Sequence, residues 1–257
     1  MSIKRGQLYP ILSLVLILLL SSKFAYAFET LETKKIVREY KKAVVQIVFR
    51  WTLSNVESGE SCDKTESGSG FIISEDGYIL TAEHVIGQGM IDIVDSASKM
   101  LVSLREIIVI TYDGKTIQAI PPDPYPPNLG VDIGILKIDK AINLPYVSIA
   151  DVDSLELGEE VVVLGYPIPE LTVTQGIIIA LSPTRETFRI SIGVSAGSSG
   201  SPVLNSDGKV IGIATFSGRG SASDGKLAAL FGVATDVTKS RKEILDFIEQ
   251  HRSKYKK

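Results

Sequence analysis

Residues 68–85 read GSGFIISEDGYILTAEHV, and this stretch carries the pattern that decides the fold. Two short apolar runs, Phe71–Ile73 and Tyr78–Leu80, flank the turn signal Glu75–Gly77. Two β-branched or aromatic runs around a Gly-containing turn predict a β-hairpin. His84 follows directly after the second run. The stretch therefore predicts two antiparallel strands with a histidine at their end.

The same pattern extends outward from this hairpin, from about residue 43 to about residue 236. Short β-branched runs alternate with turns rich in Gly, Asp, Asn and Pro. Many short strands separated in this way indicate an all-β sandwich or barrel. The further expected strands are Ala43–Phe49, Ile107–Tyr112, Val131–Ile138, Val161–Leu164, Gly176–Leu181, Lys209–Thr215 and Gly232–Ala234.

Helical patterns occur only near the two ends of the chain. Thr33–Tyr40 is charged and compatible with a helix, and Thr238–Gln250 shows apolar residues at helical spacing. The basic tail Arg252–Lys257 that follows is expected to be frayed and solvated. Pro121–Pro127 contains five prolines and is expected to be an extended connection. We see no internal repeat at a solenoid period.

The first residues have the features of a secretory signal peptide. Lys4 and Arg5 precede the apolar run Ile11–Leu20, and Ala25–Ala27 supplies small residues at a cleavage site. The run is shorter than the roughly 20 apolar residues that span a bilayer. Cleavage after Ala27 is therefore favoured over a retained membrane anchor, which stays the alternative. We expect residues 28–257 to be exported to the periplasm or secreted, without stable membrane association after cleavage.

Composition excludes several classes of function. The formal net charge of −3 gives no basic footprint for a nucleic-acid partner. The only cysteine, Cys62, stands in the polar run 57–70, which reads as a loop. A single thiol cannot form an internal disulfide, and an intermolecular bridge stays open. With two histidines and one cysteine, we expect no zinc site and no cofactor.

Ser199 is the candidate nucleophile. It stands in Ala196–Pro202 (AGSSGSP), a Gly-flanked turn just before an apolar strand. Acyl transfer needs such a hydroxyl, a base beside it, an orienting carboxylate and donors for the oxyanion. The backbone amides of Gly197 and Ser199, with Ser198 as a further candidate, could supply those donors. Taken alone, the run could also be a flexible turn without function.

His84 and Asp132 are the candidate base and orienting acid. The only other histidine, His251, lies in the charged C-terminal end, so an imidazole base would have to be His84. Asp132 is expected inside the apolar strand 131–138, where a carboxylate needs a fixed donor such as an imidazole N–H. An aspartate at the barrel edge facing water is the alternative. Asp123 is a rival acid, although its neighbours lack a strand pattern.

Together these runs resemble the HtrA/Deg branch of the chymotrypsin-fold serine peptidases, from about Ala43 to Ala234. The resemblance implies two six-stranded antiparallel β-barrels over about 43–236, followed by a C-terminal helix over about 238–250. It also implies the His–Asp–Ser roles. The matching motifs are Gly68–Ile73, Gly77–Thr81, Tyr112–Lys115, Asp132–Ile138, Leu157–Val161, Gly165–Pro167, Val173–Ile177, Gly197–Gly200 and Val210–Ile213.

The resemblance implies a serine endopeptidase that cleaves unfolded or extended polypeptides through an acyl-enzyme. It places Gly193 or its neighbour at the base of the specificity pocket. The strands with Ile213, Ala214 and Thr215 and with Gly232–Ala234 are expected along its wall. No acid stands at the base, so small or medium apolar side chains are the expected preference. A catalytically silent peptide-binding scaffold and an exported esterase are the alternatives, and the sequence leaves homo-oligomerisation open.

The chain departs from the family pattern at several points. Ser201 replaces a glycine before the motif's proline and should crowd the loop slightly, and Glu83 beside the base could shift the pKa of His84. The connection from His84 to Asp132 is unusually long, with the extra length around Gly87–Glu106 and in the proline-rich segment. Family members usually carry a PDZ domain after the peptidase, and we expect none here.

Overall fold

The computed structural model describes residues 33–55, 57–87, 93–95, 100–126, 129, 131–139, 143–151, 155–184, 186–221 and 227–255. The expected signal peptide and its cleavage site lie outside the described residues. None of the helices described is long and apolar enough to cross a bilayer.

The N-terminal half forms a closed antiparallel barrel. Its strands follow the order β1-β2-β3-β7-β6-β5, and pairing of β1 with β5 closes the ring. A further short strand, β4 (Ile93–Asp95), pairs with β5 outside the ring. The ring strands are β1 (Val44–Asn55), β2 (Ser61–Ile72), β3 (Tyr78–Thr81), β5 (Met100–Ile110), β6 (Thr116–Ile120) and β7 (Gly134–Ile138).

The hairpin predicted from residues 68–85 is confirmed as β2 and β3. Phe71 pairs with Leu80 and Ile72 with Ile79, so the two pairs lie on opposite faces of the hairpin, and all four side chains are buried in the larger hydrophobic cluster. Gly77 closes the turn with φ of 87°, a left-handed conformation that favours glycine. Local turn chemistry and apolar pattern therefore agree with the tertiary fold here.

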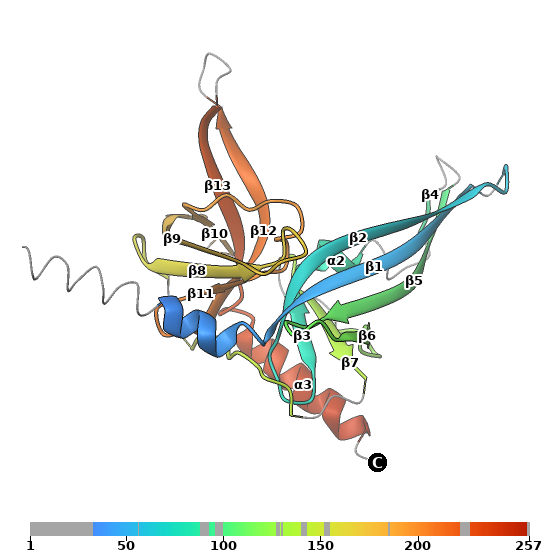
Figure 1. Ribbon diagram of the computed structural model, residues 1–257, viewed down its shortest axis with the longest axis horizontal. Helices are drawn as coiled ribbons and strands as arrows, with labels where there is room; N and C mark the ends of the chain where they lie inside the picture. The colour runs from blue at the N-terminus through green and yellow to red at the C-terminus, as the bar shows by residue number, and fades with distance from the viewer. Residues whose placement is uncertain are drawn as a thin grey trace, which may run out of the picture.

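The C-terminal half forms the second barrel, closed in the order β10-β13-β12-β11-β8-β9. The expectation of two six-stranded antiparallel barrels is confirmed, and Figure 1 shows them side by side. The strands are β8 (Glu160–Gly165), β9 (Thr172–Leu181), β10 (Thr187–Ile190), β11 (Pro202–Leu204), β12 (Val210–Ser221) and β13 (Leu227–Asp236).

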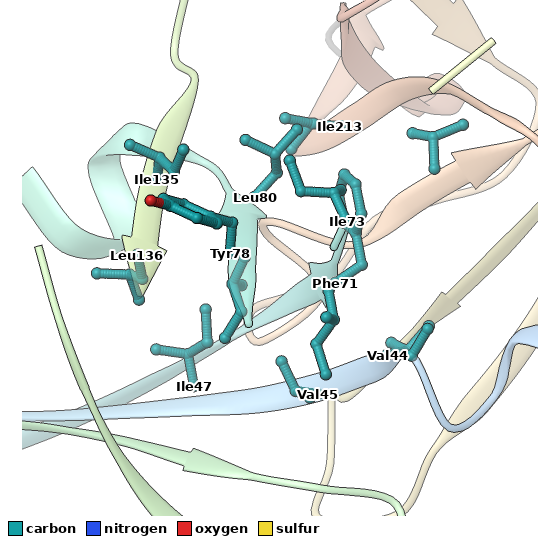
Figure 2. Packing of buried hydrophobic residues seen from close by; sticks show 14 of the residues in the cluster. Val44, Val45, Ile47, Phe71, Ile73, Tyr78, Leu80, Ile135, Leu136 and Ile213 are labelled. Atoms are coloured by element: carbon teal, nitrogen blue, oxygen red, sulfur yellow. The ribbon is translucent and has the colours of Figure 1, made fainter. Parts of the chain in front are cut away.

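The larger hydrophobic cluster crosses the boundary between the barrels. Besides the first barrel it includes Leu204, Val210 and Ile213 from the second. Figure 2 shows Ile213 among side chains of β2 and β3, including Leu80. Burying an aliphatic side chain of this size contributes about 1.5–3 kcal/mol, so the shared cluster fixes the barrels against each other.

Residues 33–40 form the expected N-terminal helix. Ile36 is buried in the larger cluster, and the ring of Tyr40 packs over Gly208, where an added Cβ would lie 2.3 Å or more from the ring. The helix therefore leads the chain from the second barrel into β1 of the first (Figure 1).

The C-terminal helix α3 (Arg241–Tyr255) starts later and ends later than expected. The expectation of a frayed tail is wrong up to Tyr255, because the last turns are anchored to the first barrel. Nδ1 of His251 lies 2.6 Å from the hydroxyl of Tyr78, and the Arg252 guanidinium donates to the carboxylate of Asp76, with Nε at 2.9 Å. Both His251 and Tyr78 are buried, so this end of the helix is part of the packed structure.

The polar run around Cys62 is a strand, which corrects the expectation of a loop. It forms β2, which pairs with β1 from Val44↔Phe71 to Ser54↔Ser61. Pairing with a β-branched neighbour outweighs the low strand propensity of Ser, Gly and Glu here. Cys62 is exposed on this strand. The outer parts of β1, β2 and β5 form a long arm beyond the barrel (Figure 1).

Candidate active site

His84 lies on α2 (Glu83–Gly87), the single turn of helix that follows β3. Glycines on the neighbouring strands bring this helix close. A Cβ at Gly134 would lie 2.7 Å from the Ile86 side chain, and one at Gly68 would lie 2.7 Å from Val85. The missing side chains thus let α2 pack directly on β7 and β2. The side chain of His84 remains half exposed, at 46%, and is open to a reactant.

Asp132 binds the His84 ring. Its carboxylate accepts a hydrogen bond from Nδ1 of His84, at 2.8 Å to Oδ2 and 3.0 Å to Oδ1. Oδ1 also accepts from the backbone N–H of His84 at 2.9 Å, and the Asp132 carbonyl accepts from the amide of Glu83 at 3.2 Å. The loop before β7 and the start of α2 therefore hold each other.

The expected position of Asp132 inside a strand is wrong. The residue has φ of 55°, and β7 begins only at Gly134. Aspartate is one of the few side chains that tolerate this left-handed conformation, because its short polar group can bond locally. The resulting turn directs the carboxylate toward α2. In an extended strand, the side chain would instead point to one face of the sheet and its apolar neighbours to the other.

The hydrogen bond to Asp132 raises the pKa of His84 above its ordinary value, against the opposing effect of partial burial. A carboxylate only accepts, so Nδ1 carries the proton in this bond and Nε2 keeps its lone pair in the neutral ring. Glu83 was expected to shift this pKa, but the causes of the shift are Asp132 and burial. The arrangement suits a general base that acts through Nε2.

The rival acid Asp123 lies elsewhere. It lines a cavity of about 680 Å³ together with Tyr78, Lys137 and His251, beside the C-terminal helix. The structure therefore brings Asp132, and not Asp123, to His84. Among the residues that the structure describes, no three His, Cys, Asp or Glu side chains lie close enough together to hold a metal ion.

The Ser199 turn depends on two glycines with φ of 89°, Gly197 and Gly200. A Cβ at Gly197 would lie 2.6 Å from the backbone oxygen of Tyr166. A Cβ at Gly200 would collide with the backbone oxygen of Ser69 and with Oγ1 of Thr81. Both positions therefore need glycine for backbone conformation and for space.

The turn leaves two backbone amides available. The amide of Ser198 donates to the oxygen of Ser195 at 2.9 Å, and that of Gly200 donates to the oxygen of Ala214 at 2.7 Å. The amides of Gly197 and Ser199 have no hydrogen-bond partner among the described residues. Of the three expected oxyanion donors, Ser198 is therefore committed to the turn, and Gly197 and Ser199 are available.

The hydroxyl of Ser199 donates to the backbone oxygen of Thr215 at 2.7 Å, and no hydrogen bond joins it to His84 in the described structure. The backbone of Ser199 nevertheless lies next to α2. A Cβ at Gly68 would lie 2.7 Å from Val85, the neighbour of His84, and 3.1 Å from the oxygen of Ser199. Val85 of α2, the neighbour of His84, and the backbone of Ser199 thus flank the same glycine.

Ile213 and Ala214, which are expected along the substrate wall, have side chains that are fully buried in the two hydrophobic clusters, and the wall itself stays a prediction. Thr215 is also buried, and its hydroxyl donates to the oxygen of Val233 at 3.1 Å. Gly193 is consistent with open space, because nothing lies within 4 Å of the position of a Cβ there. These strand residues carry the turn and do not line a pocket with their side chains.

Ser201 fits without displacing the loop, because Gly165 stands opposite. A Cβ at Gly165 would collide with Oγ of Ser201. The Ser201 hydroxyl is buried and has no hydrogen-bond partner among the described residues. The expected crowding is thus relieved by a glycine on β8.

Sequence reasoning missed Ser69, a buried residue of β2 that contacts the Ser199 turn. Its hydroxyl donates to the oxygen of Gly197 at 2.7 Å, and its amide donates to the oxygen of Ser199 at 2.8 Å. The only signal was its position between two glycines, which matched a family motif without indicating a role.

The sequence of the chain is similar to those of known peptidases. Residues 68–213 match the model of the trypsin-like peptidase domain. Proteins named "Probable periplasmic serine endoprotease DegP-like" are similar to the chain. That of Halomonas elongata is 36% identical over 162 residues, covering 60% of this chain and 30% of its own length. That of Pseudomonas putida is 33% identical over 187 residues (68% and 35%), and that of Rhizobium meliloti 30% over 216 residues (80% and 38%). The chain thus spans about a third of the length of these relatives.

Proposed function

The chain belongs to the family of trypsin-like peptidase domains, and on that premise we propose that it is an exported serine endopeptidase acting through Ser199, His84 and Asp132. The observation that carries this proposal is the contact of His84 with Asp132, 2.8 Å from Nδ1 to Oδ2, beside a turn in which two amides have no partner among the described residues. Base, acid, hydroxyl and anion donors are the parts that acyl transfer needs.

The reaction begins with a movement of the Ser199 side chain. The hydroxyl now donates to the oxygen of Thr215, and it must turn about its Cα–Cβ bond to reach His84. Such hydrogen bonds are often absent in free enzymes and form only with substrate bound. Nε2 of His84 then takes the hydroxyl proton as the oxygen attacks the carbonyl carbon of the peptide bond.

The backbone amides of Gly197 and Ser199 stabilise the negative oxygen of the tetrahedral intermediate. Asp132 keeps the ring in the correct tautomer and stabilises the imidazolium. His84 returns the proton to the leaving amine, which leaves an acyl-enzyme on Ser199. Water, deprotonated by the same imidazole, then releases the acyl group and restores the hydroxyl.

Substrate and location follow from the family resemblance and from the relatives' printed names. Those names describe periplasmic serine endoproteases, which supports export of this chain and polypeptides as its substrates. The expected signal peptide at residues 1–27 supports export independently. Unfolded or extended segments are the proposed substrates, because a peptide must lie extended along the site to place its carbonyl beside Ser199.

An esterase with the same residues and a silent peptide-binding scaffold remain the competing functions. A fluorophosphonate probe, which reacts with an activated serine, separates the scaffold from both enzymes. We expect the wild-type protein to be labelled at Ser199 and to fragment reduced, carboxymethylated casein. Ser199→Ala should do neither while keeping the same thermal unfolding midpoint.

The outcomes distinguish the three functions. Labelling without any fragments of casein, but with hydrolysis of a simple ester, would favour the esterase. Absence of labelling in folded wild-type protein would favour the scaffold. Equal fragmentation by wild type and Ser199→Ala would refute Ser199 as the nucleophile.

A further inference from the structure

Ser69 is a fully buried polar residue on β2, at the boundary between the two barrels. Its backbone amide donates to the oxygen of Ser199 at 2.8 Å, and its backbone oxygen accepts from Oγ1 of Thr81 at 2.7 Å. Thr81 is the last residue of β3 and stands three residues before His84. The backbone of Ser69 therefore joins the element that carries the base to the residue that carries the nucleophile.

The hydroxyl of Ser69 links two segments of the second barrel. It donates to the oxygen of Gly197 at 2.7 Å and accepts from the amide of Tyr166 at 2.8 Å. The same two segments are in direct contact, since a Cβ at Gly197 would lie 2.6 Å from the oxygen of Tyr166. One hydroxyl thus fixes the place where the nucleophile turn packs against the end of β8.

The bond to Gly197 also sets the direction of a peptide group. A peptide is planar and trans, so its C=O and N–H point in opposite directions. With the oxygen of Gly197 held by Ser69, the N–H of Ser198 points to Ser195, to whose oxygen it donates at 2.9 Å. If this peptide rotated, its oxygen could turn toward the developing oxyanion, and two acceptors would then repel each other.

We infer that Ser69 is a positioning residue, which holds the oxyanion turn in its donor geometry through the hydroxyl bond to Gly197. This inference rests on the proposed function. Ser69 does not touch the substrate; it acts through the direction of the Gly197–Ser198 peptide. Ser69 should therefore stabilise the transition state, in which charge develops on the oxygen. The affinity for the substrate should change little without it.

Ser69 stands on β2 between two glycines, at which an added side chain would have no room. Gly68 and Gly70 are both places where a Cβ would meet packed side chains, at 2.7 Å from Val85 and 2.6 Å from Ile47. Ser69→Ala keeps both backbone hydrogen bonds and removes both hydroxyl bonds. The variant therefore measures the effect of the two hydroxyl bonds alone, while the backbone bonds to Ser199 and Thr81 are kept.

Ser74→Ala is a matched control. Ser74 is also a buried serine of the first barrel, in the turn between β2 and β3, and its hydroxyl accepts from the amide of Tyr78 at 3.1 Å. The variant loses a hydroxyl bond to a backbone amide, as Ser69→Ala does at Tyr166, without contact to the nucleophile turn. Its kcat should stay within about 2-fold of wild type.

The test measures kcat and KM on a peptide substrate, together with affinity for a peptide boronate, which forms a tetrahedral anion on the serine. Removing one oxyanion donor outright costs about 10²–10³ in kcat, so misdirecting the turn should cost about 10–100-fold. We expect Ser69→Ala to lose this factor in kcat and in boronate affinity, with KM within about 2-fold. The pH midpoint of the acid limb should not move, because His84 and Asp132 remain paired.

Ser69→Cys covers the case in which the alanine variant does not fold. Its thiol has nearly the same shape but forms weaker hydrogen bonds, so its kcat should lie between those of wild type and Ser69→Ala. If wild type is active and both folded Ser69 variants have the same kcat as wild type, the inference about Ser69 is overturned and the proposed function is not. An increase in KM with unchanged kcat would do the same. A folded wild-type protein that neither cleaves peptides nor reacts with fluorophosphonate would overturn the proposed function itself.

Discussion

The Asp132 carboxylate accepts hydrogen bonds from both the ring and the backbone of His84, at 2.8 Å from Nδ1 and 2.9 Å from the amide. One side chain therefore orients the imidazole and also fixes the helix turn on which it stands. A third bond, from the amide of Glu83 to the oxygen of Asp132, secures the loop itself. Asp132 and its loop thus hold the proposed base, His84, through both its side chain and its main chain.

Asp132→Asn should lower kcat by about 10⁴, the loss that the equivalent change causes in the serine-protease template. The asparagine amide can donate to Nδ1, which moves the ring proton to Nε2 and removes the base. Asparagine tolerates φ of 55° as well as aspartate does, so the fold should be kept. Steady-state kinetics and circular dichroism check both statements.

Asp123→Asn is the matched control, because Asp123 lies in the cavity beside His251. Its kcat should equal that of wild type. A larger loss of kcat in Asp123→Asn than in Asp132→Asn would refute the assignment of the orienting acid.

The acid limb of kcat/KM should have its midpoint above pH 6.5. Asp132 raises the pKa of His84 through its hydrogen bond, so the ring stays protonated and inactive to a higher pH than free histidine. The same shift means that the pair's contribution to folding stability is complete below about pH 6.5 and is lost as pH rises through the raised pKa. Rates measured from about pH 5 to 9 would show a midpoint at or below 6.5 if this were incorrect.

Gly200→Ala should destabilise the protein more than Gly158→Ala. Both glycines have φ of 89°, so both variants bear the cost of a left-handed alanine, about 1–2 kcal/mol. Only at Gly200 would the added methyl collide with Ser69 and Thr81, whereas nothing lies within 4 Å at Gly158. We expect a further loss of about 1–3 kcal/mol in the free energy of unfolding by urea.

The same two variants also test whether the conformation of the Ser199 turn is needed for peptidase activity. Gly200→Ala should also lose peptidase activity, since the collision displaces the turn that carries Ser199. Gly158→Ala should keep it. Equal urea midpoints for the two variants would show that the space around Gly200 is not limiting.

Tyr78→Phe should lower the free energy of unfolding by about 1–2 kcal/mol without changing kcat. The phenylalanine keeps the ring over which Lys137 and Arg252 lie, and removes the hydroxyl 2.6 Å from Nδ1 of buried His251. Removing one hydrogen bond of a buried polar group costs about this much. A fall in kcat beyond about 2-fold would show that the C-terminal helix also influences the active site.

Local patterns were enough to predict the parts of the fold that close over short distances. The β2–β3 hairpin followed from two apolar runs around Gly77, and His84 as the proposed base followed from the scarcity of histidines. The strand character of the run around Cys62 could not be predicted, because it depends on pairing with β1, and that pairing overrides composition.

The errors at the candidate site have the same origin. The turn at Asp132 depends on a single positive φ, which an apolar pattern around it conceals. The burial of Ile213 and Ala214 depends on how the two barrels pack, and so does the position of Ser69 against Gly197. Residue types indicated the chemistry, and long-range packing decided which neighbours support it.

The long connection between His84 and Asp132 contains β4, β5 and β6, and β4 and the outer part of β5 extend outward with β1 and β2 as the arm (Figure 1). Lengthening a surface loop costs closure entropy that grows only slowly with length. We therefore expect the distal end of the first barrel to tolerate inserted residues, including segments that bind a partner. Such insertions would change which partners or substrates the protein binds, while the contact between Asp132 and His84 stays unchanged.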